Sequence, residues 1–336
     1  MLNCEEEKAL PNIYRSTCPI CRSDNIREFH VFSRLQTHVN FVGYQRSEIA
    51  LSPDGAGEPL MICRECHGVF RRDLIDFKEL FKNYHDRFED FSRDQVISRI
   101  EDEYSRLASD PTSKYVDEWN FIQKHLNSTY GKCKCATLDI GSREGVIPRA
   151  LKKDGHTANL IEPTKALVNV LKEICGIEAK CALFEKGAYP DESFDLISAM
   201  EVVHRVDHPL DFTIAAFEQL KPNGLLMLGL NNIYDLGLNY LTQQHRIIFS
   251  PYTAEILLRK SGFEVLEMRA VPGTTRIMVM ARKKEGVTPP PFKKFDSLFR
   301  LKTFLLRAEF GRTLKEGPRH EFIDAIAFRL LMLLGR

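Results

Sequence analysis

The fold of this chain is constrained most by residues 136–151, which read Ala-Thr-Leu-Asp-Ile-Gly-Ser-Arg-Glu-Gly-Val-Ile-Pro-Arg-Ala-Leu. Residues 135–140 are apolar and β-branched, as in a buried strand, and residues 144–153 have helical periodicity. Gly141 and Gly145 lie at the turn between them. A helix that begins after such a turn presents backbone N–H groups to the polar or anionic end of a ligand. The stretch therefore predicts the first unit of a nucleotide-binding α/β sheet.

The segments that follow alternate between strand-like and helix-like patterns. Strands are expected at residues 158–162, 178–182, 194–200, 225–230, 263–268 and 275–282, and helices at residues 165–174, 209–220 and 250–261. This alternation predicts a doubly wound, Rossmann-like α/β fold with a mostly parallel sheet of seven strands. A short turn at Pro272-Gly273 separates the last two strands. Because a parallel crossover needs a longer connection, the last strand is expected to run antiparallel.

Four of the nine cysteines form two Cys-x-x-Cys pairs, Cys18 with Cys21 and Cys63 with Cys66, with 41 residues between the pairs. Four thiolates suit a tetrahedral Zn²⁺ ion, and the stretches 29–41 and 60–63 read as strands of a zinc ribbon. Because the protein fills all four positions, the zinc is expected to be structural. The alternative is a set of unrelated buried cysteines. His67 could replace a ligand, but it is expected to occupy the turn after Cys66.

The net charge of +1 gives the chain no overall electrostatic attraction to nucleic acid or to a membrane. No stretch reaches the roughly 18 uninterrupted apolar residues of a membrane span. The acidic start Met-Leu-Asn-Cys-Glu-Glu-Glu is not expected to act as a signal peptide. An odd number of cysteines without an export signal favours reduced thiols. The protein is therefore expected to be cytoplasmic.

The glycine spacing distinguishes between two kinds of nucleotide ligand. A dinucleotide fingerprint, Gly-x-Gly-x-x-Gly, would need glycine at positions 141, 143 and 146, but the chain has Gly141, Arg143 and Val146. A nicotinamide enzyme is therefore disfavoured. Glu162 ends the second expected strand, 21 residues beyond Gly141. An acid at this spacing can accept hydrogen bonds from both hydroxyls of a ribose.

The spacing Asp139-x-Gly141-x-Arg143-x-Gly145 resembles the Asp-x-Gly-x-Gly-x-Gly loop of class I S-adenosylmethionine-dependent methyltransferases, with the middle glycine replaced. Residues 190–197, Pro-Asp-Glu-Ser-Phe-Asp-Leu-Ile, and 220–228, Leu-Lys-Pro-Asn-Gly-Leu-Leu-Met-Leu, resemble the family's fourth and fifth strands with their entries. Residues 245–263 are similar to the ending of a subgroup that often acts on sugars and glycan-like natural products. Several members of that subgroup also carry an N-terminal zinc ribbon. The resemblance covers roughly residues 15–283.

The resemblance implies S-adenosylmethionine as the methyl donor. The donor-binding residues that it implies are Asp139, Gly141, Arg143, Gly145, Glu162, Leu183, Phe184, Ala199 and Met200. In this set Glu162 holds the ribose, Leu183 and Phe184 form apolar walls near the adenine, and Ala199 and Met200 flank the methionine part. Leu183 stands where relatives commonly have an acid.

Two histidines are the candidate catalytic residues. His204 follows the fourth strand, and imidazole titrates near neutral pH, so His204 is the first candidate base, with a surface histidine as the alternative. His245 matches a family position on the acceptor side. The family's usual Glu-His pair reads His204-Arg205 in this chain. Glu201 is expected to be a solvated or helix-capping carboxylate.

Four segments are expected along the chain: a zinc-ribbon module (1–75), a helical connector (76–130), a methyltransferase domain (131–284) and a basic amphipathic extension (285–336). Residues 292–336 contain ten Lys/Arg against five Asp/Glu. The extension is expected to pack on its own chain or on a second copy in a homodimer. Peripheral membrane contact is the alternative.

The sequence thus predicts a methyltransferase that uses S-adenosylmethionine to methylate a small or glycan-like polar acceptor, most simply on oxygen, without a nucleic-acid partner. One alternative is a non-catalytic scaffold with a degenerate donor loop, which Arg143 and the altered Glu-His pair favour. Another alternative is an RNA methyltransferase that binds RNA through the zinc ribbon.

Overall fold

The computed structural model describes residues 13–29, 60–74, 91–233, 245–271, 274 and 276–288. Most of the expected ribbon strand at 29–41, the first part of the connector and the extension beyond residue 288 lie outside these ranges. No helix within the described ranges has the length and apolar character needed to cross a bilayer.

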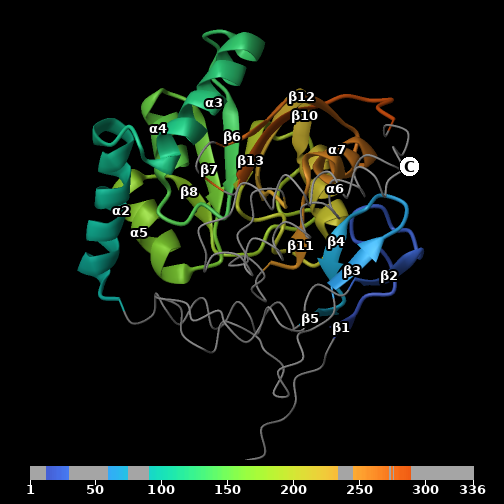
Figure 1. The fold of residues 1–336 in the computed structure, drawn as a ribbon. Coiled ribbons are helices and arrows are strands. Elements are labelled where there is room, and N and C mark those ends of the chain that lie inside the picture. Colours follow the sequence, from blue (N-terminus) through green and yellow to red (C-terminus); the bar gives the residue numbers. More distant parts are fainter. Residues whose placement is uncertain are drawn as a thin grey trace, which may run out of the picture.

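A seven-stranded sheet forms the centre of the molecule (Figure 1). Its strands are β6 (Ala136–Ile140), β7 (Thr157–Ile161), β8 (Glu178–Lys180), β9 (Phe194–Met200), β10 (Leu220–Asn231), β12 (Phe263–Ala270) and β13 (Arg276–Lys283). They are ordered β12-β13-β10-β9-β6-β7-β8. The pairs from β8 to β10 are parallel, whereas β13 runs antiparallel to both of its neighbours. The predicted α/β sheet with an antiparallel last strand is confirmed.

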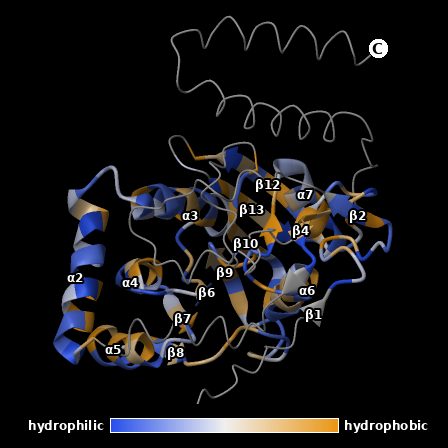
Figure 2. Cartoon of the chain, turned by 60° about the horizontal axis from the view of Figure 1, so that its bottom comes forward, coloured by the Kyte–Doolittle hydropathy of each residue, from blue (hydrophilic) through white to orange (hydrophobic). Residues whose placement is uncertain are grey.

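Helices cover both faces of this sheet. They are α2 (Arg93–Ser109), α3 (Lys114–Tyr130), α4 (Val146–Lys153), α5 (Lys165–Cys175), α6 (Pro209–Gln219) and α7 (Pro251–Lys260). Alternate residues of β10 separate the two layers: Leu225 and Met227 join the apolar cluster of α2 to α5, whereas Leu226 and Leu228 join the cluster of α6 and α7. Figure 2 shows the apolar central strands and the largely hydrophilic outer helix α2.

Side chains that begin two of the helices explain where they start. Ser92 forms a capping box with Gln95 at the start of α2, and Ser250 forms one with Thr253 at the start of α7. Each serine oxygen accepts a backbone N–H that the first helical turn leaves unpaired.

The N-terminal cysteine module is continuous with the rest of the fold. Its sheet contains β2 (Ile26–Phe29), β3 (Leu60–Cys63), β4 (Val69–Arg71) and a fourth strand, β11 (Ile247–Ile248), in the order β11-β4-β3-β2. The strands β1 (Ile13–Tyr14) and β5 (Asp73–Leu74) form a separate antiparallel pair. Because β11 comes from the distant segment after residue 245, the ribbon sheet is completed by the methyltransferase-like part of the chain. The module lies beside α6 and α7, at the opposite end from α2 and α5 (Figure 1).

Charged contacts join the module to the main sheet. Arg15 donates to the backbone oxygen of Asp207 at 2.6 Å, and the Asp207 carboxylate pairs with Arg246. The Arg246 side chain is only 1% exposed. A second, exposed pair joins Arg22 to Asp211. The buried guanidinium groups of Arg15 and Arg246 both contact Asp207, and this shared contact makes the orientation of the module specific.

Candidate functional site

The site lies at the point where the order of the strands reverses. Strand β6 has β7 on one side and β9 on the other: the chain passes outward from β6 through β7 to β8 and then crosses back to β9 on the opposite side of β6. In open α/β sheets, ligands bind in the crevice outside the carboxyl ends of the strands at this point. The glycine loop, residues 141–145, the end of β7 and the end of β9 all meet there.

The two loop glycines occupy positions that other residues would strain. Gly141 has φ +70°, and a Cβ atom there would lie 2.7 Å from Cγ2 of Val202. Gly145 has φ +67°, begins α4, and a Cβ atom there would lie 2.6 Å from Leu171. Glycine alone adopts this backbone without cost, so both positions are fixed by conformation and by packing.

Asp139 holds the loop from inside. It is buried, its Oδ2 accepts a hydrogen bond from Ser142 at 2.6 Å, and its Oδ1 accepts one from Ser198 of β9 at 2.5 Å. Burial raises the pKa of Asp139 to about 6, against the two hydroxyl hydrogen bonds. Both oxygens thus face the protein, and Asp139 shapes the glycine loop by bracing it against β9.

Glu162 connects the end of β7 to the same loop. Its Oε2 accepts the backbone N–H of Arg143 at 3.1 Å, and its Oε1 accepts the N–H of Thr164 at 3.0 Å. Each carboxylate oxygen has a second lone pair. The two backbone bonds orient the buried carboxylate and leave each of its oxygens with one further lone pair.

Arg143 adopts the backbone conformation that a glycine usually supplies, with φ +47°. One terminal nitrogen of its guanidinium, Nη2, lies 3.7 Å from Oε1 of Glu144, which also accepts from Arg99 at 2.7 Å. Arg143 and Glu144 line a cavity of about 280 Å³ that α2 and the start of α3 complete, including Lys114. The long cation thus extends toward these helices from the glycine loop.

The other predicted donor-binding residues differ in their solvent exposure and packing. Leu183 is 36% exposed on the segment after β8, whereas the ring of Phe184 packs edge-on against Phe212 at 5.0 Å. Ala199 is entirely buried in the core. The thioether of Met200 packs over Gly229, where a Cβ atom would lie 2.9 Å from Sδ.

The two candidate catalytic histidines are adjacent. The rings of His204 and His245 lie 5.0 Å apart between centroids, tilted by 31°. His204 is completely buried, and burial, with the charges of His245 and Arg205, lowers its pKa well below the ordinary value. His204 is therefore an interior imidazole that favours the neutral form, which excludes the surface histidine given as the alternative.

Glu201, expected to be a solvated or helix-capping carboxylate, is only partly solvated, with a side chain that is 30% exposed. Oε1 is shielded from solvent and has no hydrogen-bond partner within the described part of the chain, and Oε2 lies 3.7 Å from Nε2 of His204. Burial raises the pKa of Glu201, although Arg205, Arg276 and Lys114 lower it.

A buried ion pair between α3 and β13 was not predicted from the sequence. Glu118 of α3 pairs with Arg276 of β13 at 2.8 Å, with exposed side-chain fractions of 4% and 13%. Burial raises the pKa of Glu118 to about 7, against Arg276 and Lys114. No local signal marks these residues, because a single Glu on a helix and a single Arg beginning a strand ordinarily face solvent.

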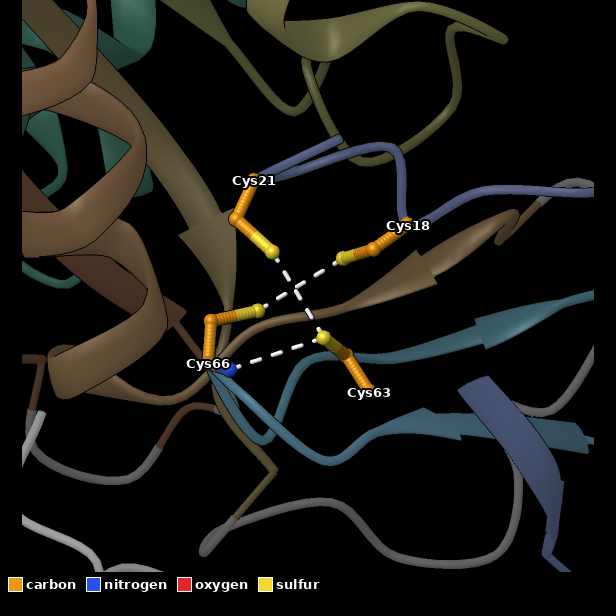
Figure 3. A group of neighbouring side chains, drawn as sticks. All are labelled: Cys18, Cys21, Cys63 and Cys66. Carbon is orange, nitrogen blue, oxygen red and sulfur yellow. Dashed lines mark hydrogen bonds between the residues drawn. The ribbon is translucent and has the colours of Figure 1, made fainter. Parts of the chain in front are cut away.

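The four predicted metal ligands converge on one point (Figure 3). Their sulfur atoms all lie within 4.8 Å of one another, and the Cys18–Cys66 and Cys21–Cys63 pairs are 3.5 Å apart. Tetrahedral Zn²⁺ with bonds of about 2.3 Å needs S–S separations of about 3.8 Å, so the arrangement fits zinc.

The turns around the cysteines match a thiolate site. Backbone N–H groups of Cys66 and Gly68 point at the sulfurs of Cys63 and Cys66, at 3.5 and 3.4 Å. A Cβ atom at Gly68 would lie 2.7 Å from Ile20, which explains the glycine. His67 has φ +58° in this turn, and the ligand cluster within the described ranges contains the four cysteines without it.

Comparison with known proteins decides the family. The family model described as "Methyltransferase domain" matches residues 92–268. The chain belongs to this family. The match spans the methyltransferase sheet from β6 through most of β12, together with α2 and α3 before it.

Curated relatives are similar to this chain over part of their length. The mitochondrial ubiquinone biosynthesis O-methyltransferase of Schizosaccharomyces pombe is 24% identical over 170 residues, which cover 48% of this chain and 56% of the relative. The ubiquinone biosynthesis O-methyltransferase of Haemophilus ducreyi is 25% identical over 124 residues, covering 34% and 51%. The chain spans about half the length of these relatives.

Solved methyltransferase structures are similar as well. A SAM-dependent methyltransferase of Thermotoga maritima, described as a possible histamine N-methyltransferase, is 21% identical with a TM-score of 0.43, covering 56% of this chain and 99% of that one. The 1,6-didemethyltoxoflavin-N1-methyltransferase of Burkholderia thailandensis is 15% identical with a TM-score of 0.46, covering 66% and 97%.

Proposed function

We propose that this protein transfers a methyl group from S-adenosylmethionine to an oxygen atom of a small or glycan-like polar acceptor. The observation that carries the proposal is the glycine loop at the end of β6. Gly141 and Gly145 let its backbone turn tightly against Val202 and Leu171, and Glu162 accepts a hydrogen bond from the loop. The family match supports the reaction class, and the names of the curated relatives favour oxygen as the methylated atom.

Each element of the site would have a distinct task. The donor supplies an electrophilic methyl group on a sulfonium. Glu162 would accept hydrogen bonds from the two ribose hydroxyls, Leu183 would lie against the base, and Met200 would flank the methionine part. Displacement at a methyl group depends mainly on aligning the two reactants, which a rigid loop braced by Asp139 favours.

His204 and His245 remain the proposed residues of the acceptor side. Because both are buried, with exposed fractions of 0% and 7%, they would act by shaping that wall of the site. Backbone hydrogen bonds from Arg246 and Ile247 to the carbonyl of His204, at 2.9 and 3.1 Å, connect this wall to β11 and the cysteine module.

We propose that the cysteine module holds a structural Zn²⁺ ion on Cys18, Cys21, Cys63 and Cys66. All four thiolates belong to the protein, so the ion would stabilise the ribbon sheet without an open position for catalysis. Reduced thiols fit the expected cytoplasmic location. The four-cysteine site would therefore help to hold β4 against β11.

Calorimetry with S-adenosylhomocysteine, followed by transfer assays with radiolabelled S-adenosylmethionine, tests the proposed function. Binding and transfer to a hydroxyl compound are expected. If calorimetry detects no heat with S-adenosylhomocysteine or with S-adenosylmethionine, the result would instead support a non-catalytic scaffold. RNA retention that weakens steeply with salt would support the RNA methyltransferase alternative.

A further inference from the structure

The residue that ends β9 has an unusual backbone conformation. Glu201 has φ +61°, in the left-handed region that non-glycine residues rarely adopt, and its N–H donates to the carbonyl of Gly229 at 3.0 Å. Such a conformation is energetically unfavourable and persists where the surroundings enforce it. Glu201 follows the last residue of β9, so this backbone conformation lies at the carboxyl edge of the sheet.

One carboxylate oxygen of Glu201 is left without a bond in this position. Its side chain is 30% exposed, so the group can be reached from outside. Oε1 nevertheless is shielded from solvent and has no hydrogen-bond partner among the described residues. A shielded acceptor without a partner is costly, and a ligand hydroxyl that donates to Oε1 would remove this cost.

Glu201 also stands beside the glycine loop. The next residue, Val202, is the side chain that a Cβ atom at Gly141 would strike at 2.7 Å. Lys114, whose charge acts on Glu201, lines the cavity that Arg143 and Glu144 complete. Glu201 therefore lies next to the glycine loop, within the electrostatic reach of a residue that lines this cavity.

We propose that Glu201 is the general base that accepts the proton of the acceptor hydroxyl. This inference rests on the proposed methyl transfer to oxygen. As the acceptor O–H bond breaks, its proton passes to Oε1 and the oxygen bonds to the methyl carbon. The C–S bond breaks with its electron pair going to sulfur, which becomes a neutral thioether. The proton is later released to solvent.

The electrostatic surroundings of Glu201 suit this role. The groups that face it are Lys114 from α3, His204 and Arg205 from the segment after β9, and Arg276 from β13, which is itself paired with Glu118. Burial raises the pKa of Glu201, which strengthens it as a base, while Arg205, Arg276 and Lys114 oppose that rise and favour the ionised form that can accept a proton.

The test compares Glu201→Gln with Glu192→Gln in the full-length chain. Glu192 is a matched control: it also has a left-handed backbone, φ +54°, but it is exposed and lies at the opposite end of β9. The probes are S-adenosylhomocysteine for donor affinity, and radiolabelled S-adenosylmethionine with 4-hydroxybenzoate, catechol, glucose and rhamnose for transfer. Glu201→Asp, which keeps a carboxylate, tests for partial rescue.

Glu201→Gln is expected to lower kcat by about 100- to 10,000-fold with the affinity for S-adenosylhomocysteine unchanged. The wild-type rate should fall at low pH as the base becomes protonated, and the variant should lose that dependence. A variant with the wild-type rate and pH profile would overturn the role of Glu201 and leave methyl transfer intact. A wild-type protein that binds no S-adenosylhomocysteine, or methylates none of the four hydroxyl compounds, would overturn the proposed function and with it the base.

Discussion

The backbone N–H of Arg143 donates to the Glu162 carboxylate at 3.1 Å, which connects the turn after β6 to the end of β7. The residue that replaces the usual loop glycine therefore contributes its backbone to the site, while its side chain extends toward Glu144. Arg143 thus keeps the left-handed backbone conformation that a glycine would adopt at this position.

Removing the charge of Glu162 should weaken donor binding. Hydrogen bonds to a charged group contribute about 1.5–3 kcal/mol each, so Glu162→Gln is expected to lower the affinity for S-adenosylhomocysteine by at least about tenfold. Calorimetry measures the effect, and Glu178→Gln, on an exposed position of β8, is the control. Equal affinities for the two variants would contradict the proposed ribose contact.

Arg143→Gly should be tolerated. A non-glycine residue in the left-handed region costs roughly 1–2 kcal/mol, and the ion pair that the arginine makes with Glu144 is long, at 3.7 Å. The free energy of unfolding is expected to stay the same or rise by up to about 1 kcal/mol, with donor affinity changed by less than about threefold. Urea unfolding and calorimetry check both, with Asn223→Gly at φ +62° as a control remote from the loop. A tenfold loss of affinity would show that the guanidinium itself binds the donor.

Cys63→Ser should remove the metal and destabilise the ribbon. Structural zinc contributes much of the folding free energy of small metal modules, so a loss of several kcal/mol is expected. Metal content by atomic absorption and Tm by calorimetry give independent measures. Cys133→Ser, at an exposed cysteine, should keep both values. If the wild-type protein carries no metal and both variants share its Tm, the zinc assignment is wrong.

Asp139 should make stability depend on pH. Its pKa is raised to about 6 in the folded state from 3.8, so the folded protein binds this proton more tightly than the unfolded chain. Its contribution is therefore greatest below about pH 4 and is lost as pH rises through about 6, by on the order of 3 kcal/mol. In Asp139→Asn this loss should be absent, so the stability of the variant relative to wild type should rise over that range. Denaturant titrations at several pH values test this against Asp191→Asn, an exposed position.

Two carboxylates that join the cysteine module to the main sheet should differ in effect. Asp207→Asn leaves the buried guanidinium of Arg246 without its charge partner, which costs roughly 3–5 kcal/mol. Asp211→Asn breaks the exposed pair with Arg22 and should cost less than about 1 kcal/mol. Thermal unfolding of the two variants measures the difference, and similar losses would mean that the buried pair does not orient the module.

The features that sequence predicted well are local ones. Gly141 and Gly145 were marked by their spacing, and the sheet followed from the alternation of strands and helices, because both depend on neighbouring residues. The four cysteines were also identifiable, since ligand type and pairing within each knuckle are short-range properties.

The features that sequence missed depend on contacts between distant residues. Glu201 reads as an ordinary charged residue until β9, α3 and β13 enclose it, and the Glu118–Arg276 pair joins positions that no local pattern relates. Likewise, the two residues of β11 are too few to show a strand period. Only the partner β4 defines them as a strand.

The pairing of β11 with β4 has a consequence for dissecting this protein. A fragment that began at α2 would expose the backbone groups of β11, and a fragment that ended after β5 would expose those of β4. Unpaired strand edges recruit other chains and promote aggregation. Truncation between β5 and α2 would thus replace the β4–β11 pairing with two unpaired strand edges. Gene fusions and fragment libraries should therefore keep both segments in one polypeptide.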